Sequence, residues 1–170
     1  MMTPALFLDR DGVMNIDKTY VYRFEDIEWV PGIFELIKWA NEKKWKVIVL
    51  TNQSGIERKY YTKEDVQILH RQMTNFLAEK GLVIDDWFFS DSLTDERRKP
   101  SPQMMFEAQK KHALDLDQSV MVGDKESDVL HAKGPEYLLI KGKYVLDSIP
   151  HTVKIFNSLF EIVQYLDTRK

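Results

Sequence analysis

The sequence predicts an α/β fold of three layers, in which a mostly parallel sheet carries helices on both faces. Short apolar runs alternate with longer segments of helical periodicity along the 170 residues, as in proteins with parallel sheets. Several apolar runs end abruptly in carboxylate, hydroxyl or glycine residues, which is typical of buried strands that reach a ligand-binding edge. No linker, repeat or low-complexity stretch interrupts the chain, so we expect a single domain over residues 1–170.

The first strand is expected at residues 5–9, an apolar run that ends in two aspartates and a glycine. Residues 12–30 are rich in aromatic residues and Asp, and predict a turn followed by a small hairpin. Pro31 and Gly32 then open a helix that continues to about Lys44. The apolar residues at helical spacing within it are Ile33, Leu36, Ile37 and Ala40.

The second strand is expected at residues 46–50, and a helix begins after Thr62, which is a good N-cap and is followed by two acids. Gly81 ends that helix. Residues 87–89 read as a short strand.

Ser101 and Pro102 begin a helix that ends near Ala113. A strand at residues 119–122 leads to Asp124, and a further helix is expected just beyond it. The rest of the chain predicts two edge strands and a closing helix, at residues 137–140, 153–156 and 158–166.

Composition narrows the classes of function. The chain is 44% hydrophobic and 30% charged with a net charge of -3, which is ordinary for a globular protein and offers no basic face for nucleic acid. Cysteine is absent, which excludes disulfides and thiol chemistry. No apolar run is long enough to span a bilayer, and no signal peptide is recognised. We therefore expect a cytoplasmic monomer or small homo-oligomer that acts on a small molecule.

Three of the expected strands end in residues of related chemistry. Asp9 and Asp11 follow the first strand, Thr51 follows the second and Asp124 the fourth. Because the carboxyl ends of parallel strands meet at one sheet edge, these side chains should surround one pocket. Two aspartates so close together repel each other unless a cation or phosphoryl chemistry uses them, although an aspartate-rich turn is a purely structural alternative.

The motifs resemble those of a known superfamily. In order, the paired aspartates, Thr51, Lys99 and Gly123-Asp124 resemble the four-motif signature of the haloacid dehalogenase-like phosphatases, from residue 7 to about residue 142. The segments FLDRDGVMN, TNQSGIERKYYT, RRKPSP and VGDKESD are most similar to the D-glycero-D-manno-heptose 1,7-bisphosphate phosphatases. The histidinol-phosphate phosphatases have similar motifs. The resemblance implies a Rossmann-like fold and a phosphomonoester hydrolase.

The resemblance also implies roles for the motif residues. Asp9 is the expected nucleophile, whose carboxylate forms an aspartyl phosphate, and Asp11 is the expected general acid and base. Thr51 and Lys99 are expected to hold the transferring phosphoryl oxygens.

A magnesium site is expected among the same residues. The ligands implied are the Asp9 and Asp124 side chains and the Asp11 main-chain carbonyl, because Mg2+ prefers hard oxygen donors. Asp128 is expected to hold Lys125, or a metal-bound water, from behind.

Substrate recognition is expected in the loops that flank these motifs. Arg98 matches an arginine that recognises substrate in the heptose phosphatases, and Arg58 is a candidate for a second phosphate. Lys125 is a further candidate. The other residues assigned to substrate binding are Asp17, Lys18, Thr19, Tyr20, Asn52, Gln53 and Ser54. Tyr60, Tyr61 and Trp87 are interpreted as packing residues.

The sequence departs from the heptose phosphatases in one loop. Many of them bind zinc through three cysteines and a histidine before the Arg-Lys-Pro segment, but residues 90–97 here contain neither residue. The four histidines are scattered, and we interpret His70 and His112 as exposed helix residues. No zinc is therefore expected. The intervals that could hold a cap are short, so no large cap domain is expected.

Two other classes of function share part of this pattern. A phospho-accepting signalling receiver also uses strand-end aspartates, Mg2+, Thr and Lys, but its nucleophile lies on a middle strand. Here the Asp-x-Asp-Gly pair opens the chain, which favours a phosphatase. A catalytically inactive binding module is disfavoured because all four motifs are intact. Within the phosphatases, heptose 1,7-bisphosphate with release of its C7 phosphate is the first choice, and histidinol phosphate or another small metabolite is the alternative.

Overall fold

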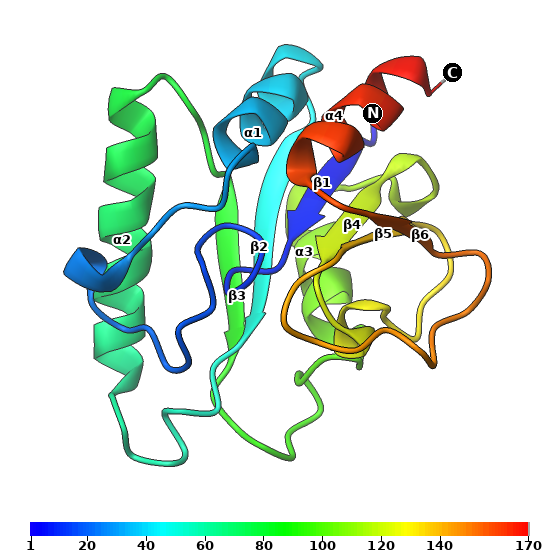
Figure 1. The fold of residues 1–170 in the computed structure, drawn as a ribbon. Helices are drawn as coiled ribbons and strands as arrows, with labels where there is room; N and C mark the ends of the chain where they lie inside the picture. Colours follow the sequence, from blue (N-terminus) through cyan, green and yellow to red (C-terminus); the bar gives the residue numbers. More distant parts are fainter. Residues whose placement is uncertain (170) are drawn as a thin grey trace.

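The computed structural model describes residues 1–169, which form one six-stranded sheet with all strands parallel, in the order β3-β2-β1-β4-β5-β6 (Figure 1). The strands are β1 (Ala5–Leu8), β2 (Lys46–Asn52), β3 (Asp86–Ser90), β4 (Val120–Gly123), β5 (Glu136–Ile140) and β6 (Lys154–Phe156). The chain moves outward from β1 to β3 and then returns to place β4 beside β1. This reversal creates a switch point between β1 and β4, where open α/β sheets bind their ligands.

Helices cover both faces of the sheet, as the sequence predicts. Three of them, α1 (Ile33–Glu42), α2 (Lys63–Glu79) and α4 (Leu159–Thr168), pack on one face, and α3 (Gln103–His112) packs on the other. All four residues of β1 are fully buried because alternate side chains enter the two apolar cores. A buried central strand of this kind fixes the position of the loop that follows it.

Local sequence explains where α2 begins. The Thr62 side chain accepts the Asp65 N–H, and the Asp65 carboxylate accepts the Thr62 N–H, so the two residues form a capping box. Residues 53–61 connect the carboxyl end of β2 to this cap, at the edge of the sheet where the functional residues lie.

Three sequence predictions about loops and strands are wrong. Residues 12–30 form no hairpin: one antiparallel bridge, between Asn15 and Trp29, closes an otherwise irregular loop that contains a short 3-10 turn at Phe24–Asp26. The helix expected beyond Asp124 is only the 3-10 turn Glu126–Asp128, because the Asp128 carboxylate folds back to accept the Asp124 N–H. β5 is not an edge strand, since β6 pairs with its outer side.

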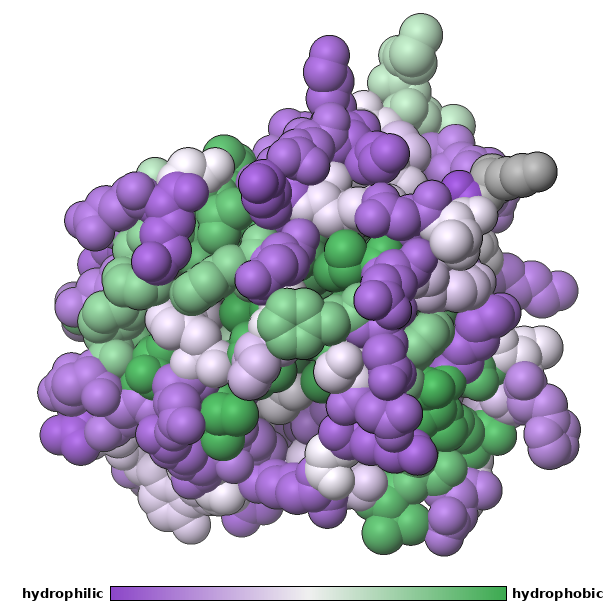
Figure 2. Space-filling view, turned by 45° about the horizontal axis from the view of Figure 1, so that its top comes forward, coloured by the Kyte–Doolittle hydropathy of each residue, from purple (hydrophilic) through white to green (hydrophobic). Residues whose placement is uncertain are grey.

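No segment of residues 1–169 folds into a separate cap over the sheet edge. None of the described helices is long and apolar enough to cross a membrane. The face seen in Figure 2 is a mosaic, with hydrophobic patches separated by hydrophilic side chains.

Candidate active site

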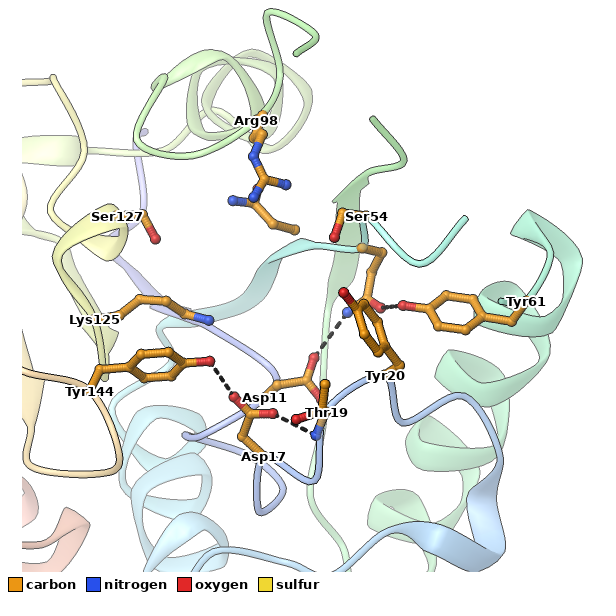
Figure 3. Close-up of a pocket in the computed structure, with 12 residues that line it drawn as sticks. Asp11, Asp17, Thr19, Tyr20, Ser54, Tyr61, Arg98, Lys125, Ser127 and Tyr144 are labelled. Carbon is orange, nitrogen blue, oxygen red and sulfur yellow. Dashed lines mark hydrogen bonds between the residues drawn. The ribbon is translucent and has the colours of Figure 1, made fainter. Parts of the chain in front are cut away.

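Asp11 and most of the predicted substrate-binding residues meet at the carboxyl edge of the sheet, around a cavity of about 220 Å³ (Figure 3). The loop after β1 contributes Asp11, Asp17, Thr19 and Tyr20 to its lining. The segment at the end of β2 contributes Asn52, Gln53 and Ser54, and two cations, Arg98 and Lys125, reach it from the loops after β3 and β4. The sequence therefore identified most of the residues that line the cavity.

A cluster of three buried carboxylates lies at the switch point between β1 and β4. Oxygen atoms of Asp9, Asp124 and Asp128 all lie within 4.8 Å of one another, and each side chain is almost fully buried. Asp9 Oδ2 and Asp124 Oδ1 are buried and have no hydrogen-bond partner among the described residues. Two hard oxygen atoms left unpaired inside a cluster of negative charge are suited to a divalent cation, so these residues fit the expected Mg2+.

Lys99 lies within this cluster and partly balances its charge. Its Nζ donates to Asp9 Oδ1 at 2.9 Å and also to the Asp128 carboxylate, and its side chain is 1% exposed. Asp128 therefore holds Lys99 and not Lys125 as the sequence suggested. Lys125 lies at the other side, with its Nζ 3.9 Å from Asp9 Oδ2. The unpaired oxygen of Asp9 thus lies next to a positive charge at the cavity.

Burial and mutual repulsion shift the ionisation of the cluster in the metal-free protein. Burial and the Asp128 charge raise the pKa of Asp9, although Lys99 and Lys125 oppose the shift. Burial, Asp9 and Asp128 raise the pKa of Asp124 from 3.8 to about 9. Burial lowers the pKa of Lys99, but the Asp128 and Asp9 charges more than compensate, so its pKa is raised and the ammonium stays charged.

Asp11 is held in place by hydrogen bonds to both of its oxygens. Oδ1 accepts from Arg10 Nη2 and Asn15 Nδ2, each at 3.1 Å, while Oδ2 accepts from Gln53 Nε2 at 3.0 Å. The side chain is 18% exposed and lines the cavity. Its carboxylate therefore has a fixed orientation beside Asp9, as a group that transfers a proton at a defined atom requires.

Two residues assigned to substrate binding also position the motif residues. Asn52 bonds the Lys99 backbone twice, as acceptor from its N–H at 2.9 Å and as donor to its carbonyl at 3.1 Å. Gln53 Nε2 donates to Thr51 Oγ1 at 2.8 Å as well as to Asp11, and Gln53 Oε1 accepts the Tyr61 hydroxyl at 2.6 Å. Both amides line the cavity, and each already bonds a motif residue or its backbone.

Close approach explains two glycines at the switch point. A Cβ added at Gly12, which has φ of +90°, would lie 1.9 Å from Asp124 Oδ2, and one added at Gly123 would lie 2.1 Å from Asp128 Cβ. Both clashes involve the carboxylate cluster, so the cluster can assemble only where these two positions lack a side chain.

Lys18 and Arg58 are not brought into the cavity. The Lys18 ammonium donates to the Asp26 carbonyl and pairs with Glu28 on the exposed side of the loop. Arg58 is exposed and does not line the cavity. Arg98 is half-buried and lines it, with its Nη1 donating to the Ser92 carbonyl at 3.3 Å.

Sequence reasoning missed a buried network behind Asp11. Arg10, between the two aspartates, is fully buried and bonds the Asp11 carboxylate, the Val21 carbonyl and Gln53. His70, expected to be exposed, is buried: its ring stacks on Trp87 at 4.1 Å and its Nε2 contacts Arg10 Nη1 at 3.2 Å. The helical pattern of α2 did carry a signal for this, because His70 lies four residues after Val66 and three before Met73, at the spacing of the buried residues of the helix.

The buried His70 should make stability depend on pH. Burial and the Arg10 charge hold its pKa well below 6.5, so below about pH 6.5 the unfolded chain binds a proton that the folded protein does not, and stability falls as pH falls. A His70→Gln variant keeps an acceptor for Arg10 but cannot titrate. Between pH 7 and pH 5, we expect the unfolding free energy of the variant to fall by about 1–2 kcal/mol less than that of the wild type.

Urea unfolding at several pH values measures this difference, and His131→Gln, at an exposed position, is the matched control. Equal pH dependence in all three proteins would show that His70 titrates normally.

Three comparisons relate the chain to known proteins. It matches the family model described as "Polynucleotide kinase 3 phosphatase" over residues 8–137. It is 46% identical over 134 residues to a Helicobacter pylori protein named D-glycero-beta-D-manno-heptose-1,7-bisphosphate 7-phosphatase, which covers 74% of this chain and 75% of that protein. A Campylobacter jejuni protein, named as the corresponding alpha-heptose phosphatase, is 42% identical over 130 residues and covers 76% of each chain.

The fold agrees with a solved structure. A crystal structure of D,D-heptose 1,7-bisphosphate phosphatase from B. bronchiseptica, complexed with magnesium and phosphate, superposes with a TM-score of 0.86 at 27% identity and covers 96% of this chain and 98% of that one.

Proposed function

Because the chain belongs to the D-glycero-D-manno-heptose 1,7-bisphosphate 7-phosphatases of the haloacid dehalogenase-like superfamily, we propose that it removes the C7 phosphate from such a bisphosphate with the help of Mg2+. Similar relatives are named for the alpha and for the beta anomer, so the proposal covers both.

One observation carries the proposal at the level of atoms. Asp9 has one oxygen fixed by Lys99 and the Arg10 N–H, while its other oxygen is buried without a hydrogen-bond partner among residues 1–169. A carboxylate held by one oxygen and free at the other is arranged to attack phosphorus.

The reaction then has two displacements. Asp9 Oδ2 forms a bond to phosphorus while the bond from phosphorus to the sugar C7 oxygen breaks, and Asp11 gives a proton to that oxygen. Water next attacks phosphorus, Asp11 takes its proton, and the bond to Asp9 breaks to release phosphate.

The neighbouring residues stabilise the transferring group. Thr51 and Lys99 hold its oxygens, and Gln53 fixes both Thr51 and Asp11. Asp124, the Asp11 carbonyl and the Asp9 oxygen that does not attack phosphorus would hold Mg2+, with Asp128 close by. When bound, the ion supplies positive charge that offsets repulsion between the phosphate and the carboxylates.

Phosphate release from a panel of substrates tests the proposal directly. With Mg2+ present, we expect kcat/KM for heptose 1,7-bisphosphate to exceed that for histidinol phosphate and for p-nitrophenyl phosphate by at least about a hundredfold, since remote binding energy lowers the barrier at the reacting phosphate. Preference for histidinol phosphate would reject the substrate and keep the phosphatase. A single phosphorylation of Asp9 without turnover would identify a receiver instead.

Arg98 should contribute to selectivity for the bisphosphate. It lines the cavity with part of its guanidinium uncommitted, so Arg98→Ala should lower kcat/KM for the heptose bisphosphate by about ten- to a hundredfold and lower it much less for p-nitrophenyl phosphate, which has no remote phosphate. Arg58→Ala is the matched control and should leave both rates unchanged, because Arg58 lies outside the cavity lining. Equal losses on both substrates for Arg98→Ala would place this arginine at the transferring phosphate.

A further inference from the structure

The loop between β5 and β6 crosses to the loop after β1 at the rim of the cavity. The Tyr144 hydroxyl donates to Asp17 Oδ2 at 2.7 Å (Figure 3). The Lys143 ammonium lies 3.1 Å from the same oxygen. We call Asp17, Lys143 and Tyr144 the clasp. In the sequence, Lys143 and Tyr144 lie 126 and 127 residues after Asp17.

The clasp holds a strained piece of backbone. Thr19 and Tyr20 both have left-handed conformations, with φ of 63° and 55°, which are unfavourable for residues other than glycine and especially for a β-branched threonine. The second oxygen of Asp17 accepts the Thr19 N–H at 2.9 Å, and Lys143 Nζ lies 3.4 Å from Thr19 Oγ1. Such strain persists only where surrounding contacts impose it, and the clasp supplies those contacts.

The strained residues face the substrate cavity. Thr19 and Tyr20 both line it, and the Tyr20 ring meets Tyr60 of the loop after β2 edge-on, with centroids 4.7 Å apart. Tyr144 lines the cavity too, and its ring centroid lies 4.8 Å from Lys125 Nζ. The position of the clasp therefore decides where one wall of the cavity lies relative to Lys125.

We propose that Tyr144 is a specificity-determining residue of this site, which positions the Thr19-Tyr20 wall through Asp17 so that the cavity fits the sugar part of the substrate. This inference rests on the proposed function for the identity of the sugar, but not for the clasp. It also gives Asp17 a role in holding the wall, where the sequence suggested direct binding of substrate. Tyr144 lies outside the four motifs, and only the fold brings it to the cavity.

A Tyr144→Phe variant tests the proposal, because it keeps the ring and removes the hydroxyl. Tyr137→Phe is the matched control: its hydroxyl donates to the Ala132 carbonyl at 2.9 Å and does not line the cavity. Without substrate, we expect backbone hydrogen exchange of residues 16–21 to become at least about fivefold faster in Tyr144→Phe and to stay unchanged in the control. For the heptose bisphosphate, kcat/KM should fall by about three- to thirtyfold, mainly through KM, with a several-fold smaller loss on p-nitrophenyl phosphate.

A double-mutant cycle shows whether Tyr144 acts through Asp17. If it does, the variant that carries both Asp17→Ala and Tyr144→Phe should be no more impaired than Asp17→Ala alone. Additive losses would overturn the proposal. The proposal would also be overturned if hydrogen exchange of residues 16–21 were unchanged in Tyr144→Phe. It would likewise be overturned if exchange became faster while the ratio of kcat/KM for the heptose bisphosphate to kcat/KM for p-nitrophenyl phosphate stayed the same.

The proposed function can fail separately. If the wild-type protein does not hydrolyse the heptose bisphosphate, the identity of the sugar is wrong. Loop exchange then still decides whether the clasp exists, and the substrate ratio is measured with the sugar phosphate that the wild type hydrolyses best.

Discussion

Asp9→Asn should abolish turnover and leave the fold intact. The amide is nearly the same size as the carboxylate and keeps an oxygen for Lys99 and the Arg10 N–H, but it is a far poorer nucleophile. Because the step that it removes is covalent, we expect the rate to fall by more than the roughly hundred- to ten-thousandfold that follows loss of an acid or base. Steady-state phosphate release measures the loss, and thermal unfolding reports whether the variant is folded.

Asp26→Asn is a suitable control, since this acid bonds Arg23 in the 3-10 turn and does not line the cavity. If Asp9→Asn retained a tenth of the wild-type rate, Asp9 would not be the nucleophile. Asp11→Asn gives an independent check: the aspartyl phosphate should then accumulate and add one phosphoryl group to the protein mass.

Local patterns made the sheet and the carboxyl edge predictable. A buried parallel strand needs a run of apolar residues; β1 and β4 end where that run meets Asp9 and Asp124, while β2 continues through Thr51 to Asn52. Parallel pairing then brings these ends together without further information. Parallel strands were sufficient to predict this shared edge, but the order of the strands, which places β1 between β2 and β4, was not predicted.

Other features depend on contacts that local patterns record only in part. His70 is buried because Arg10 and Trp87 close over it, and these residues come from two different strands or their ends. The segment after Asp124 contains residues that can form a helix, but the Asp128 side chain competes for the backbone of Asp124 and stops it after one turn. The contact between His70 and Arg10 is tertiary, whereas the bond from the Asp124 N–H to Asp128 spans only four residues; the Lys99 ammonium, distant in sequence, bonds the same Asp128 carboxylate.

The sequence also could not show which polar residues of the cavity position other residues. Asn52 and Gln53 are polar, follow a strand and face the cavity, which are the features expected of substrate ligands. Only their hydrogen bonds to the Lys99 backbone, Thr51 and Asp11 reveal that they position other residues.

Asp124→Asn should have opposite effects on activity and on stability. Without metal, burial and the neighbouring carboxylates raise the pKa of Asp124 from 3.8 to about 9, so the folded protein keeps a proton that the unfolded chain has released. The contribution of Asp124 to stability is therefore present below about pH 3.8 and is lost as pH rises toward 9. Asparagine removes this dependence, and the metal-free variant should be more stable than the wild type at pH 7 by about 1–4 kcal/mol.

Metal binding should reverse that order. The variant lacks one of the two unpaired carboxylate oxygens of the cluster, so we expect Mg2+ to stabilise the wild type and not the variant, and kcat/KM to fall at least about a thousandfold. Urea unfolding at pH 6 and pH 8, with EDTA or with Mg2+, measures both stability effects.

Asp128→Asn is the informative control because the chemical change is the same. Its amide has one oxygen, so it can accept from the buried Lys99 ammonium or from the Asp124 N–H but not from both as the carboxylate does, and it removes the negative charge beside Lys99; it should therefore destabilise the protein with or without metal. Suppose instead that Asp124→Asn lowered the stability of the metal-free protein as Asp128→Asn does. Asp124 would then be a structural residue of the network around Lys99, and the carboxylate cluster would not be a cation-binding site.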